Sequence, residues 1–215
     1  RCEMDKILII ADDLTGALDS GVAFADAGIS TCVGEGEFFS TNEDAKTCAV
    51  QVTVVPTRHM SGDDAYRAVY NVIKKAKACG IRCILKKVDS ALRGNVGAEL
   101  AASLAATGEK TLYFVPAFPK MKRVTRNGIQ YIDGDIPVAE SVFRQDPFNP
   151  VRHSAVADVI AETTSVTAYP ADPSREDYPA GIAVFDAQTD GDIQRIAAHL
   201  FHDLGASLVS GCAGL

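Results

Sequence analysis

Residues 6–28, KILIIADDLTGALDSGVAFADAG, give the clearest indication of the fold. Residues 6–11 are a continuous apolar run, which is typical of a strand buried on both faces of a parallel sheet. Asp12 and Asp13 follow at once, and residues 15–27 then carry the apolar spacing of a helix that ends at a glycine. A strand that runs directly into a helix is the first half of a βαβ unit.

The same alternation continues along the chain. Further strands are predicted at 30–33, 48–55, 82–88, 111–117, 166–169, 181–187 and 207–211, and further helices at 61–78, at 96–106, after a capping Ser154, and at 190–204. Such alternation predicts a three-layer α/β fold, with a mostly parallel sheet covered by helices on both faces. The pattern breaks between 116 and 150, where a small β-hairpin insert is predicted around Asp133 and Gly134. We expect a single α/β domain over 1–215.

Composition excludes several classes of function. With 47% hydrophobic and 23% charged residues, the chain does not have the composition of a disordered protein. It also lacks the apolar run of roughly 18 residues that a membrane helix requires. A net charge of −7 argues against nucleic-acid binding. No secretory signal is visible, so we expect a cytoplasmic protein whose six cysteines are reduced thiols.

The last residues, GCAGL, form a glycine-rich turn after a predicted parallel strand. Such a turn normally leads into another helix. We therefore expect a C-terminal part that this chain lacks.

Polar side chains follow several predicted strands, at Asp12 and Asp13, at Thr57 and Arg58, and at 87–93 and 116–126. Ligands of open α/β sheets bind outside the carboxyl ends of the strands, so we expect these segments to converge on one edge. Neighbouring carboxylates there can bind substrate hydroxyls, hold a cation or accept a proton. The alternative is that one aspartate only caps the helix, but this leaves the second unexplained.

Thr15 and Gly16 add free N–H groups at the helix N-terminus, a favourable place for an anion. Within KKVDSALRGNVG, residues 86–97, Lys87 and Arg93 are suited to clamp a carboxylate, Arg93 bidentately. Ser90 and nearby amides complete this predicted anion site, and Asp89 is available for a hydroxyl. The alternative is a solvated charged loop, and the position at the sheet edge counts against it.

Several familiar sites are missing from the sequence. There is no phosphate-binding G-x-x-x-x-G-K-[ST] loop, no dinucleotide G-x-G-x-x-G and no G-x-S-x-G elbow. Cysteines and histidines lack zinc-site spacing, so no metal site is predicted. A haloacid-dehalogenase phosphatase needs D-x-D, and a receiver domain needs an aspartate after the third strand, where this chain has VVPTRH.

Five ordered motifs carry a resemblance to a known family. They are ADDLTGALDSG, KKVDSALRGNVGAEL, PAFPKMKRVTRNGIQYIDG, DPFNPV and SGCAGL. In this order they resemble the N-terminal domain of the four-carbon acid sugar kinases, once catalogued as a domain of unknown function. The resemblance runs from about Lys6 to Leu215.

The resemblance implies an ATP-dependent kinase that phosphorylates four-carbon sugar acids such as 3-dehydrotetronate, erythronate or threonate. Its N-terminal domain holds the acid, while a C-terminal domain, absent here, binds ATP and Mg²⁺. This chain alone is then expected to be inactive and to carry no cofactor. A non-catalytic sugar-acid-binding module is the competing interpretation, and pairing into a homodimer is left open.

The resemblance also implies the residues of the sugar-acid pocket, which are Asp12, Asp13, Thr15, Gly16, Arg58, Lys87, Asp89, Ser90 and Arg93. The cationic side chains are expected to bind the carboxylate of the sugar acid, and the carboxylate side chains are expected to bind its hydroxyls. Asp13 and Asp89 are both candidates for the catalytic base. Ala91 stands where the family pattern often has Thr, and PTRHM replaces a commoner Asp-Ser-Arg context, so the choice among sugar acids is left open.

Overall fold

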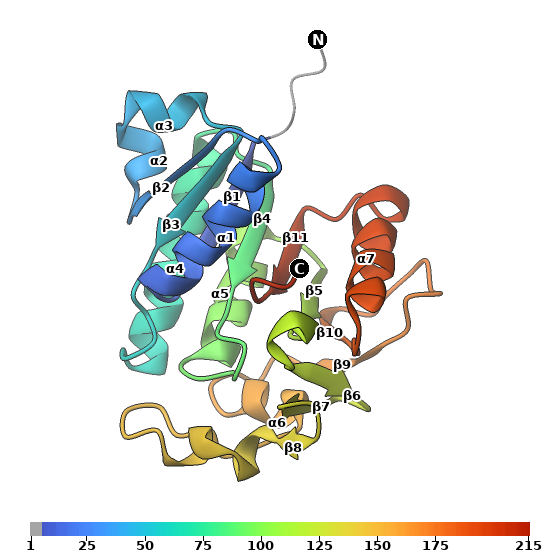
Figure 1. Ribbon diagram of the computed structural model, residues 1–215. Coiled ribbons are helices and arrows are strands. Elements are labelled where there is room, and N and C mark those ends of the chain that lie inside the picture. The colour runs from blue at the N-terminus through green and yellow to red at the C-terminus, as the bar shows by residue number, and fades with distance from the viewer. Residues whose placement is uncertain (1–5) are drawn as a thin grey trace.

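The computed structural model describes residues 6–215. Within them, one sheet has the strand order β2-β3-β1-β4-β11-β5-β10-β9, and every neighbouring pair is parallel (Figure 1). The strands are β1 (Ile7–Ala11), β2 (Thr31–Glu35), β3 (Val50–Val54), β4 (Cys83–Lys87), β5 (Thr111–Val115), β9 (Ala168–Ala171), β10 (Gly181–Phe185) and β11 (Leu208–Gly211). The predicted parallel α/β sheet is confirmed.

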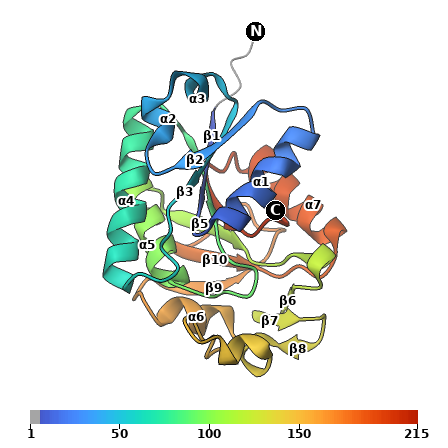
Figure 2. The same ribbon diagram turned by 60° about the vertical axis from the view of Figure 1, so that its left-hand side comes forward.

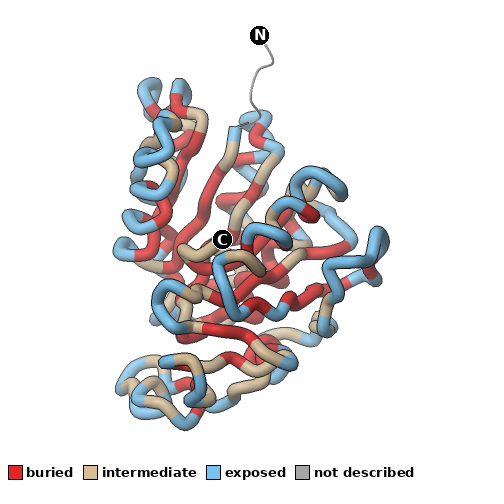
Figure 3. Tube along the Cα trace, turned by 45° about the vertical axis from the view of Figure 1, so that its right-hand side comes forward, coloured by how far each residue is buried: buried red, intermediate tan, exposed pale blue. Residues whose placement is uncertain are grey.

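Helices cover both faces of this sheet (Figure 2). One face packs on α4 (Gly62–Ala78), α5 (Val96–Thr107) and α6 (Val156–Ala161), and the other on α1 (Leu14–Asp26) and α7 (Asp190–Ala198), which a π-helical turn (His199–Asp203) extends. Successive side chains of a strand point to opposite faces. The inner strands are accordingly buried along most of their length, whereas the edge strands β2 and β9 are partly exposed (Figure 3).

The structure adds elements that the sequence pattern did not indicate. Two short helices, α2 (Phe38–Thr41) and α3 (Glu43–Thr47), lie in the predicted acidic loop. The insert contains three antiparallel strands, β6 (Val124–Arg126), β7 (Ile129–Ile132) and β8 (Ile136–Pro137), with 3-10 turns at Pro119–Met121, Val138–Glu140 and Val142–Gln145. The predicted hairpin is confirmed between β7 and β8, where Asp133 and Gly134 both have the positive φ of a tight hairpin turn.

Two local predictions are wrong. Ser154 does not cap α6: the N-cap is Ala155, and the Ser154 hydroxyl instead accepts a hydrogen bond from the amide of Ala139 at 3.0 Å. Cys32 and Cys48 are not reduced thiols but form a disulfide. Cys32 lies in β2 and Cys48 lies just before β3. Because these two strands pair, the Cα atoms of the cysteines are 6.0 Å apart, within the ordinary span of a disulfide. No helix within residues 6–215 is long and apolar enough to span a membrane.

The strand register sets the position of the functional site. Ala11 pairs with both Val54 and Lys87, and Gly211 pairs with both Lys87 and Val115. The last residues of these five strands therefore lie in one row. The loops that leave the sheet from this row start at the same level, and their side chains meet above it.

Candidate functional site

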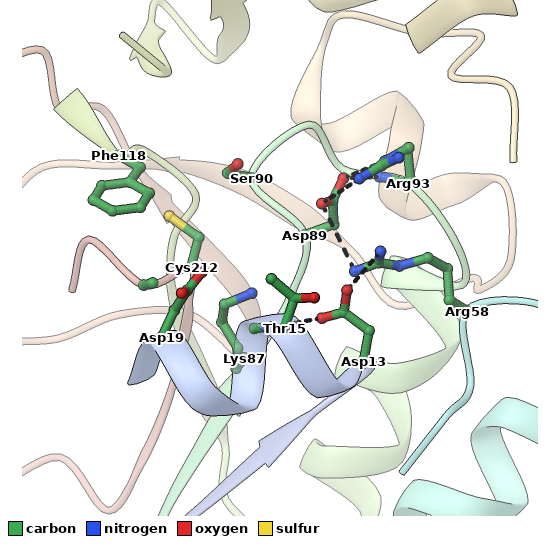
Figure 4. Close-up of a pocket in the computed structure, with 12 residues that line it drawn as sticks. Asp13, Thr15, Asp19, Arg58, Lys87, Asp89, Ser90, Arg93, Phe118 and Cys212 are labelled. Carbon is green, nitrogen blue, oxygen red and sulfur yellow. Dashed lines mark hydrogen bonds and ion pairs between the residues drawn. The ribbon is translucent and has the colours of Figure 1, made fainter. Parts of the chain in front are cut away.

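A cavity of about 230 Å³ lies at the carboxyl edge of the sheet (Figure 4). Among its lining residues are Asp13, Thr15, Gly16, Arg58, Lys87, Asp89, Ser90 and Arg93, which are all the predicted site residues except Asp12. Four further residues complete the lining, namely Asp19, Phe118, Cys212 and Ala213. Segments from the ends of β1, β3, β4, β5 and β11 thus share one cavity.

The two adjacent aspartates have different partners. Asp13 is the N-cap of α1, and its Oδ1 accepts a hydrogen bond from the amide of Gly16 at 2.9 Å. Asp12 is only 3% exposed and lies outside the cavity lining. Its Oδ2 accepts a hydrogen bond from Nε of Arg58 at 2.8 Å, whereas its buried Oδ1 has no partner among the described residues. Capping therefore accounts for one aspartate, and the second binds an arginine from another loop.

Arg58 connects three carboxylates at the cavity wall. Besides Asp12, its Nη1 lies 2.9 Å from Oδ2 of Asp13, and its Nη2 lies 3.7 Å from Oδ1 of Asp89. Burial lowers the pKa of Arg58, but the hydrogen bond to Asp12 and the charges of the three carboxylates raise the pKa above its ordinary value. The guanidinium is therefore a permanent cation that ties the loop after β3 to those after β1 and β4.

Arg93 is bound by two carboxylates. It forms a bidentate pair with Asp89 and donates a hydrogen bond from Nη1 to Oδ2 of Asp146 at 3.2 Å. Burial raises the pKa of Asp89, but the hydrogen bonds and charge of Arg93 and the charge of Arg58 outweigh it and lower the pKa below its ordinary value. The N–H edge of Arg93 that was predicted to clamp a substrate carboxylate is thus occupied by Asp89.

Lys87 is different from the two arginines. Its side chain is buried and its Nζ donates to the carbonyl of Val88 at 2.7 Å, but no carboxylate of residues 6–215 lies within ion-pair distance of it. It lies beneath the N-terminus of α1, where a Cβ on Gly16 would stand 2.5 Å from its Nζ. An ammonium without a carboxylate partner and a positive helix end therefore share one side of the cavity.

The lining residues that sequence reasoning missed lie mostly across the cavity from the arginines (Figure 4). Asp19 follows Thr15 by one helical turn, and Cys212 directly follows β11, so helix periodicity and the strand end were available signals. Phe118 lies in one of the quoted motifs. The Cys212 thiol donates to the carbonyl of Ala117 at 3.0 Å, and burial raises its pKa to about 11, which keeps it protonated.

The cavity does not fit a metal ion or a nucleotide. Within the described part of the chain, no three His, Cys, Asp or Glu side chains are arranged to hold a metal ion. Of the carboxylates at the cavity, Asp13 and Asp89 are paired with Arg58 and Arg93. A volume of about 230 Å³ is below the range of roughly 300–1,000 Å³ that holds drug-sized ligands. The site suits a small polar anion.

Comparison with known proteins shows which family the chain resembles. Residues 7–215 match the family model described as "Sugar-binding N-terminal domain". The chain is 35% identical over 196 residues to a D-threonate kinase of Bordetella bronchiseptica, covering 88% of this chain and 48% of that protein. It is 30% identical over 227 residues to a D-erythronate kinase of Heliobacterium modesticaldum, covering 96% of this chain and 50% of that protein.

Among solved structures, a domain-swapped dimer from Bordetella bronchiseptica with bound citrate is 32% identical with a TM-score of 0.86, covering 98% of this chain and 55% of that one. The chain spans about half the length of the curated relatives it matches. These relatives are kinases of four-carbon sugar acids, and the match extends over nearly all of the described residues. The chain therefore belongs to the family of sugar-binding N-terminal domains of the four-carbon acid sugar kinases.

Proposed function

We propose that this chain is the acid-binding part of an ATP-dependent kinase for four-carbon sugar acids of the threonate, erythronate or 3-dehydrotetronate type. The acid binds in the cavity at the carboxyl edge of the sheet. ATP and Mg²⁺ are bound mainly by a C-terminal domain that corresponds to the other half of the relatives. The length of those relatives and the poor fit of the cavity to a nucleotide support this division.

The observation that carries the proposal is the position of Lys87. Among the cavity cations it alone lacks a carboxylate partner within the described residues, and it lies at the N-terminus of α1. A substrate carboxylate placed there neutralises the ammonium and meets the positive end of the helix. The similar solved structure from Bordetella bronchiseptica contains bound citrate, which is consistent with a cavity for carboxylic acids.

The carboxylates of the cavity are suited to the substrate hydroxyls. Asp89 is held by Arg93 through both oxygens, and its lowered pKa makes it a weak proton acceptor. Asp13 is also bound, by the amide of Gly16 and by Arg58, but its side chain is 30% exposed against 12% for Asp89, so a substrate hydroxyl reaches it more readily. Of the two candidates for the base, we therefore favour Asp13, and assign Asp89 to orienting a hydroxyl. Phosphoryl transfer depends chiefly on positioning and charge neutralisation, so this base contributes only part of the rate.

Calorimetry tests acid binding on the chain itself. D-threonate, D-erythronate and 3-oxo-tetronate are titrated into the 215-residue protein, with a four-carbon polyol that lacks the carboxylate as the control. We expect binding of at least one acid and no measurable binding of the polyol. Equal heats from acid and polyol would contradict the assignment of the carboxylate to Lys87.

Turnover tests the division between two domains. ATP-dependent phosphorylation is measured for this chain and for a chain extended by the C-terminal half that the relatives possess. We expect turnover only for the extended protein, and Asp13→Asn to lower its kcat more than Asp89→Asn. Turnover by the short chain contradicts the division, whereas acid binding without turnover by either chain identifies a non-catalytic binding module.

A further inference from the structure

A buried charged pair lies under the cavity, on the opposite face of β4. Lys86 is fully buried and Glu99 of α5 is 2% exposed, and Nζ of Lys86 lies 2.6 Å from Oε2 of Glu99. Because Lys86 and Lys87 are consecutive in a strand, their side chains leave opposite faces of the sheet. Neither member of the pair lines the cavity. Removing two charges from water is costly, so such a pair calls for a reason beyond packing.

Each member of the pair makes a further hydrogen bond to a segment that carries a cavity residue. Oε1 of Glu99 accepts a hydrogen bond from the hydroxyl of Thr57 at 2.6 Å, and Thr57 directly precedes Arg58. Nζ of Lys86 donates to the carbonyl of Lys87 at 2.7 Å. The pair therefore connects the backbone segments that carry two cations of the cavity, one after β3 and one at the end of β4.

The start of α5 holds the same loop by independent contacts. Nδ2 of Asn95 donates to the carbonyls of Thr57 and Met60, both at 2.9 Å. A Cβ on Gly94 would lie 3.1 Å from Cγ of Arg58 and 3.3 Å from its Cα. Asn95 and Glu99 are one helical turn apart, so both face the loop after β3. The position of Arg58 is thus set from below by α5.

We propose that Lys86, Glu99 and Thr57 are positioning residues that fix the separation of Arg58 and Lys87 across the cavity. They act through the backbone and touch no substrate. This inference rests on the proposed function for its effect on acid binding, but its effect on Arg58 is measurable without any ligand. It also keeps Arg58 in place against Oδ2 of the buried Asp12.

Thr57 offers the sharpest test, because Val has nearly the shape of Thr but lacks the hydroxyl. Thr57→Val is compared with the conservative variant Thr57→Ser. The matched control is Ser103→Ala in α5, the helix that carries Glu99. It removes a fully buried hydroxyl, which donates a hydrogen bond to the backbone carbonyl of Glu99 at 2.8 Å. All four proteins are compared by thermal unfolding, by calorimetry with the best-bound sugar acid, and by NMR of arginine Nε–H groups.

The Nε–H of Arg58 donates to Asp12, so in the wild type we expect a slowly exchanging signal for it. Thr57→Val should speed up this exchange and weaken acid binding by about tenfold or more, the scale of one hydrogen bond to a charged group. Thr57→Ser should restore both properties. Ser103→Ala should lower the unfolding temperature and leave both properties as they are in the wild type.

Each other outcome overturns a defined statement. If Thr57→Val retains the exchange rate of Arg58 and the affinity, the positioning role is wrong. If Ser103→Ala weakens binding as much as Thr57→Val, the effect is one of general stability, and the positioning role is again wrong. If the wild type binds no sugar acid, the proposed function fails, while the NMR comparison still decides whether Thr57 holds Arg58.

Discussion

The guanidinium of Arg93 is bound edge to edge by the carboxylate of Asp89, with Nε 2.8 Å from Oδ2 and Nη2 3.0 Å from Oδ1. Charge-assisted bidentate pairs of this kind are the strong ones among side-chain hydrogen bonds. The pair places one positive and one negative group at the cavity wall in a fixed orientation. An incoming anion therefore meets Arg93 as a partly neutralised group, and Lys87 as a less neutralised one.

Arg93→Ala removes the bidentate partner of Asp89 and makes the cavity wall more negative by one unit of charge. We expect sugar-acid affinity to fall by roughly 1.5–3 kcal/mol, the scale of a hydrogen bond to a charged group. Calorimetry measures this change. Asp146→Asn is the matched control, because it removes only the outer partner of Arg93 and leaves the bidentate pair in place. A larger loss in the control than in Arg93→Ala would contradict the importance of the pair.

Lys87→Met should remove the main contact of the substrate carboxylate while preserving the aliphatic stem of the side chain. We expect affinity for the sugar acid to fall by roughly 1.5–3 kcal/mol. The measurement is calorimetry at two salt concentrations, because the wild-type affinity should also fall as salt screens the charge. Lys122→Met, at an exposed lysine of the insert, serves as the control. Unchanged affinity in Lys87→Met would show that the carboxylate binds elsewhere.

Gly16→Ala should impair the site while leaving the fold intact. The added Cβ would stand 2.5 Å from Nζ of Lys87 and 2.7 Å from Oδ1 of Asp13, both of which are side-chain atoms able to move. We expect sugar-acid affinity to fall about tenfold or more, because small displacements of binding groups are costly.

The control for that variant is Gly191→Ala in the first turn of α7. There the nearest atoms to an added Cβ are 3.6 Å away, an ordinary contact. This control should raise the free energy of unfolding by about 0.5–1 kcal/mol, as expected for alanine in place of glycine within a helix. Its affinity should match the wild type. Equal affinity in both variants would contradict the close approach of Lys87 to α1.

Low pH should destabilise the protein, partly because the carboxylate of Asp89 becomes protonated. Its pKa in the folded protein lies below the ordinary value of 3.8, so the ionised form stabilises the fold at pH values above 3.8, and this contribution is lost as the pH falls through the folded-state pKa. The free energy of unfolding is measured with denaturant between pH 7 and pH 3. Asp89→Asn should have a smaller loss of stability over the acidic part of this range. A parallel decline in both proteins would show that Asp89 titrates normally.

Much of the fold was predictable because the strands and helices of parallel α/β units have recognisable local sequence patterns. Apolar runs such as residues 6–11, each followed by helical spacing, predict strands and helices without reference to the rest of the chain. The rule that ligands bind at the carboxyl ends of strands then brought Asp13, Arg58 and Lys87 together. The shared row of strand ends supplies the geometry that this rule assumes.

The pairing of side chains was not predictable in this way. Nothing in the local sequence shows that Arg93 is occupied by Asp89 and Asp146, since the latter lies 53 residues away. The disulfide between Cys32 and Cys48 and the buried pair of Lys86 with Glu99 depend in the same way on which segments become neighbours.

The kind of fold, the sheet edge that carries the site and the chemical types of the site residues could therefore be predicted from the amino-acid sequence, because they follow from periodicity and residue chemistry. Which charged side chains pair with one another, and that Lys87 has no carboxylate partner among the described residues, depended on the three-dimensional arrangement of the chain. Strand order and register bring distant segments into contact, and hydrogen bonds and ion pairs act only over such short distances.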